Sequence, residues 1–295
     1  MYGVRNDSVR RIVDRNRLRL RCHRIDRRMK QRQCFVESEK LSRVQLRIPK
    51  MVNSESGHGR EGVEAAQAPT VLALETSTAA CSIALTVRGV VHSDNRIVPR
   101  EHNRLILPMI DSLLASAGVD RSELDAIAFG RGPGSFTGVR IAAGIAQGIA
   151  LGLSLPVVPV SSLAALAQAA VEMHPQARGV LATIRSRADE IYLAGYGFGA
   201  DRDVVWIAES VVTATQRELP ACVDAAWWVV GDGLAHFDPQ SVATRGCSVD
   251  AAQLPNATGV LTLALQALAR GDSVEAAQAL PVYLQGTRPW RKLAD

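Results

Sequence analysis

Apolar and polar positions alternate with a changing period along this chain, which predicts strands and helices in turn. Between residues 71 and 171, runs with a period of two predict strands, and apolar positions three and four residues apart predict helices. Gly118 follows one helical run and Ser161 precedes another, as expected at helix boundaries. In order, we expect strands at 71–74, 82–87 and 90–98, a helix at 100–117, a strand at 124–129, a helix at 137–152, a strand at 157–160 and a helix at 161–171.

The second half of the chain repeats this order less regularly. The expected elements there are strands at 180–184, 191–198, 204–206 and 227–230 and a helix at 259–270. Three strands followed by alternating helices and strands predict a layered α/β fold. We therefore expect a first lobe at 70–175 and a second, smaller lobe with the C-terminal tail at 176–295.

Composition limits the class of protein. Hydrophobic residues make up 47% of the chain but aromatic residues only 4%, so the core must consist mostly of Ala, Val, Leu and Ile. The five cysteines are scattered without Cys-x-x-Cys spacing, which argues against a disulfide framework and favours the reducing cytoplasm. The apolar run 141–160 contains Gln147, Pro156 and Pro159, so we expect a helix, a turn and a strand there and no membrane span.

Positive charge is concentrated at the N-terminus. Residues 1–50 hold 16 of the 34 basic and five of the 29 acidic residues, which leaves the rest of the chain with 18 basic and 24 acidic residues. We expect residues 1–69 to be a disordered basic extension. It could be an inert segment upstream of the true start or an RNA-contacting arm, whereas its scattered acids argue against a transit peptide. The acidic body is not expected to bind nucleic acid strongly by itself.

A glycine-rich run lies between a predicted strand and a predicted helix. It reads Gly130-Arg-Gly-Pro-Gly-Ser-Phe-Thr-Gly-Val-Arg140. Free N–H groups at a helix N-terminus bind anions, and Ser135 or Thr137 could cap this helix. Glycine needed only for tight packing of the turn explains the run equally well. The run matches neither a Walker loop nor a GxGxxG motif with a downstream acid, nor the Gly-x-Ser-x-Gly of serine hydrolases.

Four ordered motifs resemble the TsaB (YeaZ) family. They are the glycine-rich run with the Ile141-Ala-Ala-Gly-Ile-Ala-Gln-Gly148 stretch after it, the run 72–85, Pro99-Arg-Glu-His102 with Leu107-Pro-Met109, and Pro281-Val-Tyr-Leu284 with Trp290-Arg-Lys-Leu293. The resemblance implies an actin-like ATPase (ribonuclease H-like) fold with two lobes. It also implies a non-catalytic scaffold subunit that activates TsaD, which makes N6-threonylcarbamoyladenosine on tRNA, with the ATPase TsaE as a further partner and tRNA reached through the complex.

The turn after the first strand is a second candidate for phosphate binding. In actin-like ATPases, which the resemblance brings in, the corresponding turn carries an acid and hydroxyls. A hairpin whose side chains satisfy its own backbone would look the same. The family more often has Asp where this chain has Glu75, and Arg185 stands where the family has Asp, so any nucleotide role is weakened. The possible phosphate-loop residues are Glu75, Thr76, Ser77, Gly132, Gly134, Ser135, Thr137 and Gly138.

Two predicted helices carry faces that we expect to bind another subunit. Gly144, Gly148 and Gly152 recur every four residues and so share one helix face, where small residues permit close approach of another helix. Packing within the domain would explain the same spacing. The resemblance implies binding of TsaD through these two helices, with a homodimer possible for the chain alone. The expected interface residues are His102, Leu105, Ile106, Met109, Ile110, Leu113, Ile141, Gly144, Ile145 and Gly148.

Metal chemistry is not expected. A helical metal pair needs a second histidine four residues after His102, where this chain has Ile106. A metallopeptidase is therefore the weakest of three function classes. The alternative to a non-catalytic subunit is an actin-like ATP-dependent phosphotransferase using the Glu75-Thr76 turn and the Gly132–Gly138 loop. We expect no cofactor of the chain's own, with ATP or ADP possible at the partner interface.

Overall fold

The computed structural model describes residues 68–186, 190–198, 204–213 and 218–284, which belong to one compact unit of the chain. The expectations for the basic extension up to residue 67 and for the tail with Trp290 lie outside the described residues. The elements are β1 (Val71–Glu75), β2 (Ala80–Val87), β3 (Val90–Ile97), α3 (His102–Ala117), η3 (Arg121–Glu123), β4 (Ala126–Gly130), α4 (Phe136–Leu153), β5 (Val157–Val160), α5 (Ser162–Met173), β6 (Gly179–Arg185), β7 (Glu190–Gly197), β8 (Val204–Thr213), β9 (Trp227–Val230), η4 (Asp232–His236), α6 (Pro239–Arg245), β10 (Ser248–Asp250), α7 (Ala257–Ala269) and η5 (Ala276–Gln278).

Two five-stranded sheets share one strand order. In the first, β3-β2-β1-β4-β5, the pairs among β1, β2 and β3 are antiparallel, whereas β4 runs parallel to β1 and β5. In the second, β10-β9-β6-β7-β8, an antiparallel meander of β6, β7 and β8 again has two parallel strands on its other side. The repeated order is that of the ribonuclease H-like fold, so the expected α/β fold with two lobes is confirmed.

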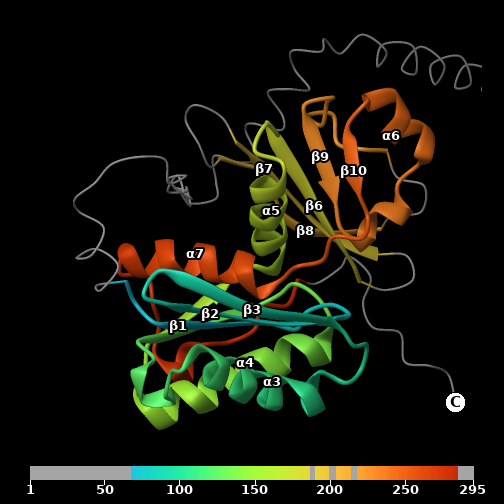
Figure 1. The fold of residues 1–295 in the computed structure, drawn as a ribbon. Helices are drawn as coiled ribbons and strands as arrows, with labels where there is room; N and C mark the ends of the chain where they lie inside the picture. The colour runs from blue at the N-terminus through green and yellow to red at the C-terminus, as the bar shows by residue number, and fades with distance from the viewer. Residues whose placement is uncertain (1–67, 187–189, 199–203, 214–217, 285–295) are drawn as a thin grey trace, which may run out of the picture. The chain divides into compact units, whose positions relative to one another are not determined.

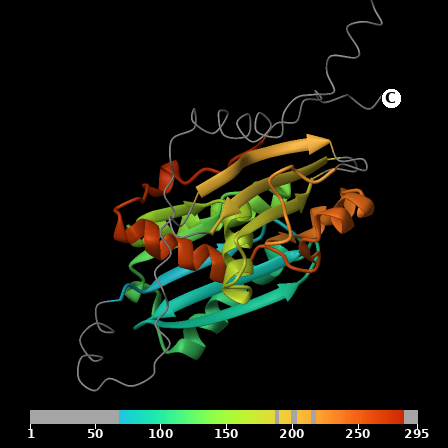
Figure 2. The same ribbon diagram turned by 90° about the horizontal axis from the view of Figure 1, so that it is seen from above.

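Helices cover both faces of the first sheet. Figures 1 and 2 show α3 and α4 on one face and α7 on the other. Alternate residues of β1 face the two layers, as a strand's period of two requires. Leu72 and Leu74 join the core under α3 and α4, whereas Val71 and Ala73 join the core under α7. The first sheet is thus buried on both faces by apolar helix faces.

The chain returns to the first lobe after it has built the second sheet. α7 lies in the range that we assigned to the second lobe, yet its buried residues pack on the first sheet. Its first backbone N–H, at Ala257, donates to the Ser82 hydroxyl on β2 at 2.9 Å. Gly259 lies so close to α5 that an added Cβ would overlap the carbonyl oxygen of Ala165. The apolar face of β1 and β4 needs a cover that no helix of residues 70–175 supplies, which is why α7 lies there.

The long apolar run around α4 forms a helix, a turn and a strand, as expected. By length and composition α4 could cross a membrane. However, Ala142, Ala146 and Ala150 are buried in the core of the first lobe. The helix ends at Leu153, and β5 begins four residues later at Val157.

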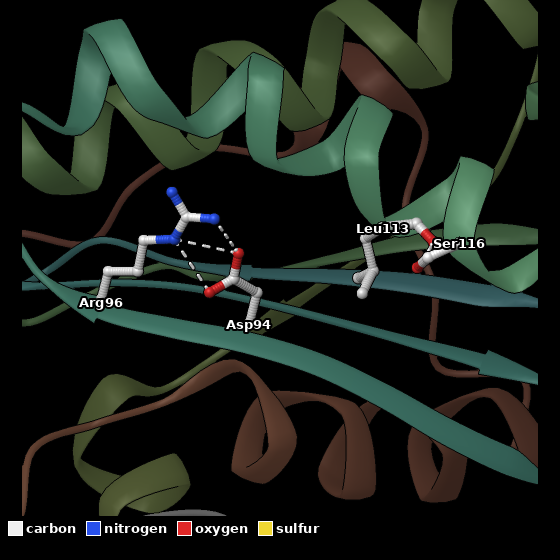
Figure 3. A network of polar contacts seen from close by, with 4 residues as sticks. All are labelled: Asp94, Arg96, Leu113 and Ser116. Carbon is white, nitrogen blue, oxygen red and sulfur yellow. Dashed lines mark hydrogen bonds and ion pairs between the residues drawn. The ribbon is translucent and has the colours of Figure 1, made fainter.

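Charged residues mark the edge strand β3. Asp94 and Arg96 rise from β3 on the side of the sheet where α3 lies, and their side chains form an ion pair with an N···O distance of 2.7 Å (Figure 3). On α3, the Ser116 hydroxyl donates to the carbonyl oxygen of Leu113 one turn earlier. Charges on an edge strand discourage its pairing with another chain.

Candidate functional site

A fully buried carboxylate organises the turn after β1. Glu75 is only 1% exposed. One of its oxygens accepts from the Ser77 backbone N–H at 2.6 Å, and the other accepts from the Ser162 hydroxyl at 2.8 Å. Burial raises the pKa of Glu75 above its usual value of 4.5, and these hydrogen bonds oppose the rise only in part. Both carboxylate oxygens are therefore engaged by the protein itself.

The glycine-rich loop packs directly against this turn. The Thr76 hydroxyl donates to the carbonyl oxygen of Gly138 at 2.7 Å, and the Ser135 N–H donates to the carbonyl oxygen of Ser77 at 2.7 Å. A Cβ at Gly134 would lie 2.5 Å from the Ser77 carbonyl oxygen, and one at Gly138 would overlap the Thr76 carbonyl oxygen. The glycines thus permit contact between two backbone segments that lie far apart in sequence.

Further contacts hold the same loop from other sides. Gly132 has a φ of +98°, a conformation that favours glycine, and its carbonyl oxygen accepts from the Ser162 N–H at 2.9 Å. Ser135 is the N-cap of α4 and accepts from the Gly138 N–H at 3.4 Å, so it is Ser135 that caps the helix. The structure brings all the expected loop and turn residues together except Thr137, whose side chain is exposed on α4.

Within the described residues, no three His, Cys, Asp or Glu side chains gather in a way that could hold a metal ion. His102 is buried, with its Nε2 3.1 Å from the carbonyl oxygen of Ala80. The first residue of α3 is thereby attached to β2, which gives His102 a structural contact.

In the second lobe, the strand that carries Arg185 is tied to η4. The backbone N–H of Arg185 donates to a carboxylate oxygen of Asp232 at 2.7 Å, and the guanidinium lies 3.8 Å from the other oxygen. Nothing in the sequence analysis singled out Asp232. The Asp232 carboxylate lies beside Arg185, the position at which the resemblance implies an aspartate.

Half of the residues expected to meet a partner face the chain's own core, and this corrects the expectation. An apolar stripe on a helix predicts burial but does not say against what, and here the sheet covers the stripe of α3. The inward-facing residues are His102, Ile106, Met109, Ile110 and Leu113.

The outer face of α4 has the opposite character. Gly144, Gly148 and Gly152 are exposed, and apart from the adjacent residues and the helix's own backbone, no atom of the described residues lies within 4 Å of a Cβ added at any of them. It is the neighbouring face, with Ala146 at its middle, that packs within the domain. Large apolar side chains also lie exposed on α4 and α3; these are Phe136 (55%), Leu151 (76%) and Leu107 (50%).

A groove of about 430 Å³ lies between α3 and the start of α4. Beside it, the Arg140 guanidinium carbon lies 3.6 Å from the centroid of the Phe136 ring, and its Nε donates to the Tyr283 hydroxyl at 2.8 Å. Tyr283 in turn contacts Phe136, with ring centroids 5.5 Å apart. The residues that line the groove are Asn103, Phe136, Thr137, Arg140, Ile141, Gly144 and Ile145.

Comparison with known proteins decides the family. The TsaB protein of Haemophilus influenzae is 40% identical over 231 residues, which span 76% of this chain and 97% of that protein. The Escherichia coli TsaB is 38% identical over 229 residues, with the same shares. This chain belongs to the TsaB family. A family model described as TsaD, tRNA N6-adenosine threonylcarbamoyltransferase, also matches residues 85–273.

Solved structures agree with the TsaB assignment. YeaZ from Pseudomonas aeruginosa is 44% identical, and the match has a TM-score of 0.65 over 73% of this chain and 100% of that one. A second P. aeruginosa structure, described as similar to peptidase YEAZ, is also 44% identical, with a TM-score of 0.67 over 74% of this chain. The resemblance noted from four motifs is therefore confirmed over most of the chain.

Sequence reasoning missed several residues of this TsaB-family surface. Phe136 and Arg140 stand one helical turn apart within the glycine-rich motif, a spacing that places them on one helix face. Leu107 and Leu151 were hidden because isolated exposed leucines look like core residues in a sequence. Tyr283 stands in a quoted motif, but its contact with Arg140 could not be found, since it joins residues 143 positions apart.

Proposed function

We propose that this chain is a non-catalytic, cytoplasmic subunit for biosynthesis of N6-threonylcarbamoyladenosine on tRNA and that it binds a TsaD protein through the outer faces of α3 and α4. The named role of the TsaB relatives supports the biosynthetic part, because the similarity spans 97% of their length. TsaD would carry the chemistry and bring the tRNA, and the ATPase TsaE would be a further partner.

The glycine stripe, which consists of the exposed Gly144, Gly148 and Gly152 on α4, is the observation that best supports the proposal. Each glycine inside a helix costs about 0.8–1.0 kcal/mol relative to alanine. Gly144, Gly148 and Gly152 therefore cost roughly 3 kcal/mol together, and nothing in the part of the chain that the structure describes packs against them in return. A surface that admits the backbone of another helix at close range accounts for that cost. The exposed Leu107 and Leu151 beside the stripe supply apolar area for the same contact.

The turn and loop support a structural role rather than catalysis by this chain. Both oxygens of Glu75 accept protein hydrogen bonds, and the loop backbone lies against the turn without room for a Cβ. A phosphotransferase would need these groups free to meet phosphate and a metal-bound water. We therefore propose that any ATP or ADP of the complex binds at the partner interface instead.

The test is gel filtration with light scattering, with this chain alone and mixed with the TsaD of the same organism. A one-to-one complex is expected, and TsaD activity in threonylcarbamoyladenosine formation should depend on it. The Gly148→Leu variant should lose the complex while it stays folded. Ala243→Leu, an equally exposed helical substitution on α6, is the matched control and should bind normally.

Two outcomes would contradict the proposal. Normal TsaD binding by Gly148→Leu would remove the α4 face from the interface. No complex with the wild-type chain, together with ATP turnover by this chain alone, would favour the phosphotransferase alternative.

A further inference from the structure

The two helices of the proposed interface, α3 and α4, differ in whether their charged side chains form ion pairs. Arg104 of α3 forms an ion pair with Glu101, and Asp111 of α3 forms one with Arg121. α4 carries Arg140 as its one charged residue. Among the described residues, no carboxylate lies within ion-pair distance of the Arg140 guanidinium, which leaves this charge unbalanced at the edge of the groove.

Arg140 is nevertheless held in place. Its guanidinium stacks on Phe136, and its Nε is occupied by the Tyr283 hydroxyl. The two terminal nitrogens have no hydrogen-bond partner among the described residues, so four N–H donors remain available. A guanidinium that is already ordered loses little side-chain entropy when it binds, and its planar fork matches a carboxylate.

We infer that the partner of this surface is a different protein, which presents an aspartate or glutamate side chain to Arg140 from a helix seated on the glycine stripe. The inference rests on the proposed function and names the chemistry of the contact. The apolar part of the groove, with Phe136, Ile141 and Ile145, would exclude water from the pair and strengthen it.

A second copy of this chain fits the surface less well. A two-fold interface places the same patch on both sides, so the α4 helices would face each other. Each copy would bring Arg140 but no acid from α4, and the single acid of α3, Asp111, is already paired with Arg121. The surface therefore lacks charge complementarity with itself.

The experiment titrates TsaD of the same organism with full-length Arg140 variants, without added nucleotide. Arg140→Glu should weaken the complex at least about tenfold, because truncating a charge pair at an interface costs several times RT and reversal adds repulsion. Arg140→Lys should bind with an affinity between those of the wild type and Arg140→Glu, since it retains the charge but loses the planar fork and the stack on Phe136. Arg178→Glu, a reversal of an exposed arginine in the second lobe whose own partner is Asp224, is the control and should bind within about threefold of the wild type.

Tyr283 serves as a positioning residue, and it provides a variant that leaves the charge in place. Tyr283→Phe keeps the ring beside Phe136 but removes the hydroxyl that accepts from Arg140. Affinity for TsaD should fall a few-fold with an unchanged melting temperature, and the salt dependence of binding should stay that of the wild type. In Arg140→Glu, by contrast, added salt should relieve part of the loss.

The outcomes separate this inference from the proposed function. If Gly148→Leu abolishes the complex and Arg140→Glu binds like the wild type, the carboxylate contact is wrong and the proposed function stands. If neither Gly148→Leu nor Arg140→Glu weakens TsaD binding, both the carboxylate contact and the proposed function are wrong. An effect of Arg140→Glu that appears only when ATP is added would assign Arg140 to a nucleotide phosphate and overturn the inference. Equal loss of self-association and of TsaD binding would also overturn it, because a second copy would then be a natural ligand of the surface.

Discussion

Two glycines on one helix should respond to alanine in opposite ways. In Gly148→Ala the new methyl group meets nothing within 4 Å, so the helix gains the difference in propensity, about 0.5–1 kcal/mol of unfolding free energy. In Gly138→Ala the methyl group overlaps the carbonyl oxygen of Thr76 and lies 3.0 Å from its carbonyl carbon. Both are backbone atoms, so the clash is relieved only by a shift of the turn or of α4, which costs about 1–3 kcal/mol as overpacking does.

The measurement is urea unfolding of both variants and the wild type, followed by circular dichroism. The helix gain in the first turn offsets part of the clash, so Gly138→Ala should lose about 1–2 kcal/mol and the two variants should differ by about 1.5–3 kcal/mol. For a folded body of this size, each kcal/mol also shifts the melting temperature by about 2–4 °C. If Gly138→Ala were as stable as Gly148→Ala, the loop could not pack on the Glu75 turn as described, and the argument against a free phosphate loop would fail.

Two further predictions concern buried titratable groups. The pKa of Glu75 is raised by burial, so its contribution to stability is full below the unfolded value of 4.5 and is lost as the pH rises through the folded value. Glu75→Gln should therefore gain stability relative to the wild type as the pH rises above 4.5 in urea titrations, and a constant difference would contradict the raised pKa. Burial, and next to it the charge of Asp94, raises the pKa of the Cys81 thiol to about 11. At about pH 8 its thiolate fraction should be roughly 200-fold below that of an ordinary cysteine, so peptide mapping should find Cys81 among the last thiols to be alkylated, and rapid labelling would refute the burial.

Much of the fold follows from local patterns. The bounds of β5 and β9 and the Ser161 cap of α5 agree with the sequence prediction, because short β-branched runs and a capping serine are local signals. The short α6 and β10 were missed, since seven and three residues carry too little periodicity to be recognised. The position of α7 on the first sheet could not be predicted from its own residues, which are apolar on most sides and would suit either lobe.

The site was predictable in its residues but not in its contacts. Periodicity identified the stripe on α3 and the glycines on α4, yet an apolar stripe and a glycine stripe look alike as candidates for an interface. The difference is energetic: Ile106 and Met109 are buried against the sheet, whereas among the described residues no side chain packs on Gly144 or Gly148. The hydrogen bond between Thr76 and Gly138 joins residues 62 positions apart, a distance that no local pattern reports.

The contact of residues 282 and 283 with the glycine-rich loop and α4 has a consequence for synthesis. The Val282 N–H donates to the carbonyl oxygen of Arg131, and Tyr283 binds Arg140, so both contacts form only after residues 282 and 283 have been translated. The first sheet likewise waits for α7 before its second face is covered. A chain that stops before α7 would therefore expose apolar sheet surface, and one that stops before Tyr283 would lack the hydrogen bond that orders Arg140, so synthesis of these two segments is a checkpoint for assembly with a partner.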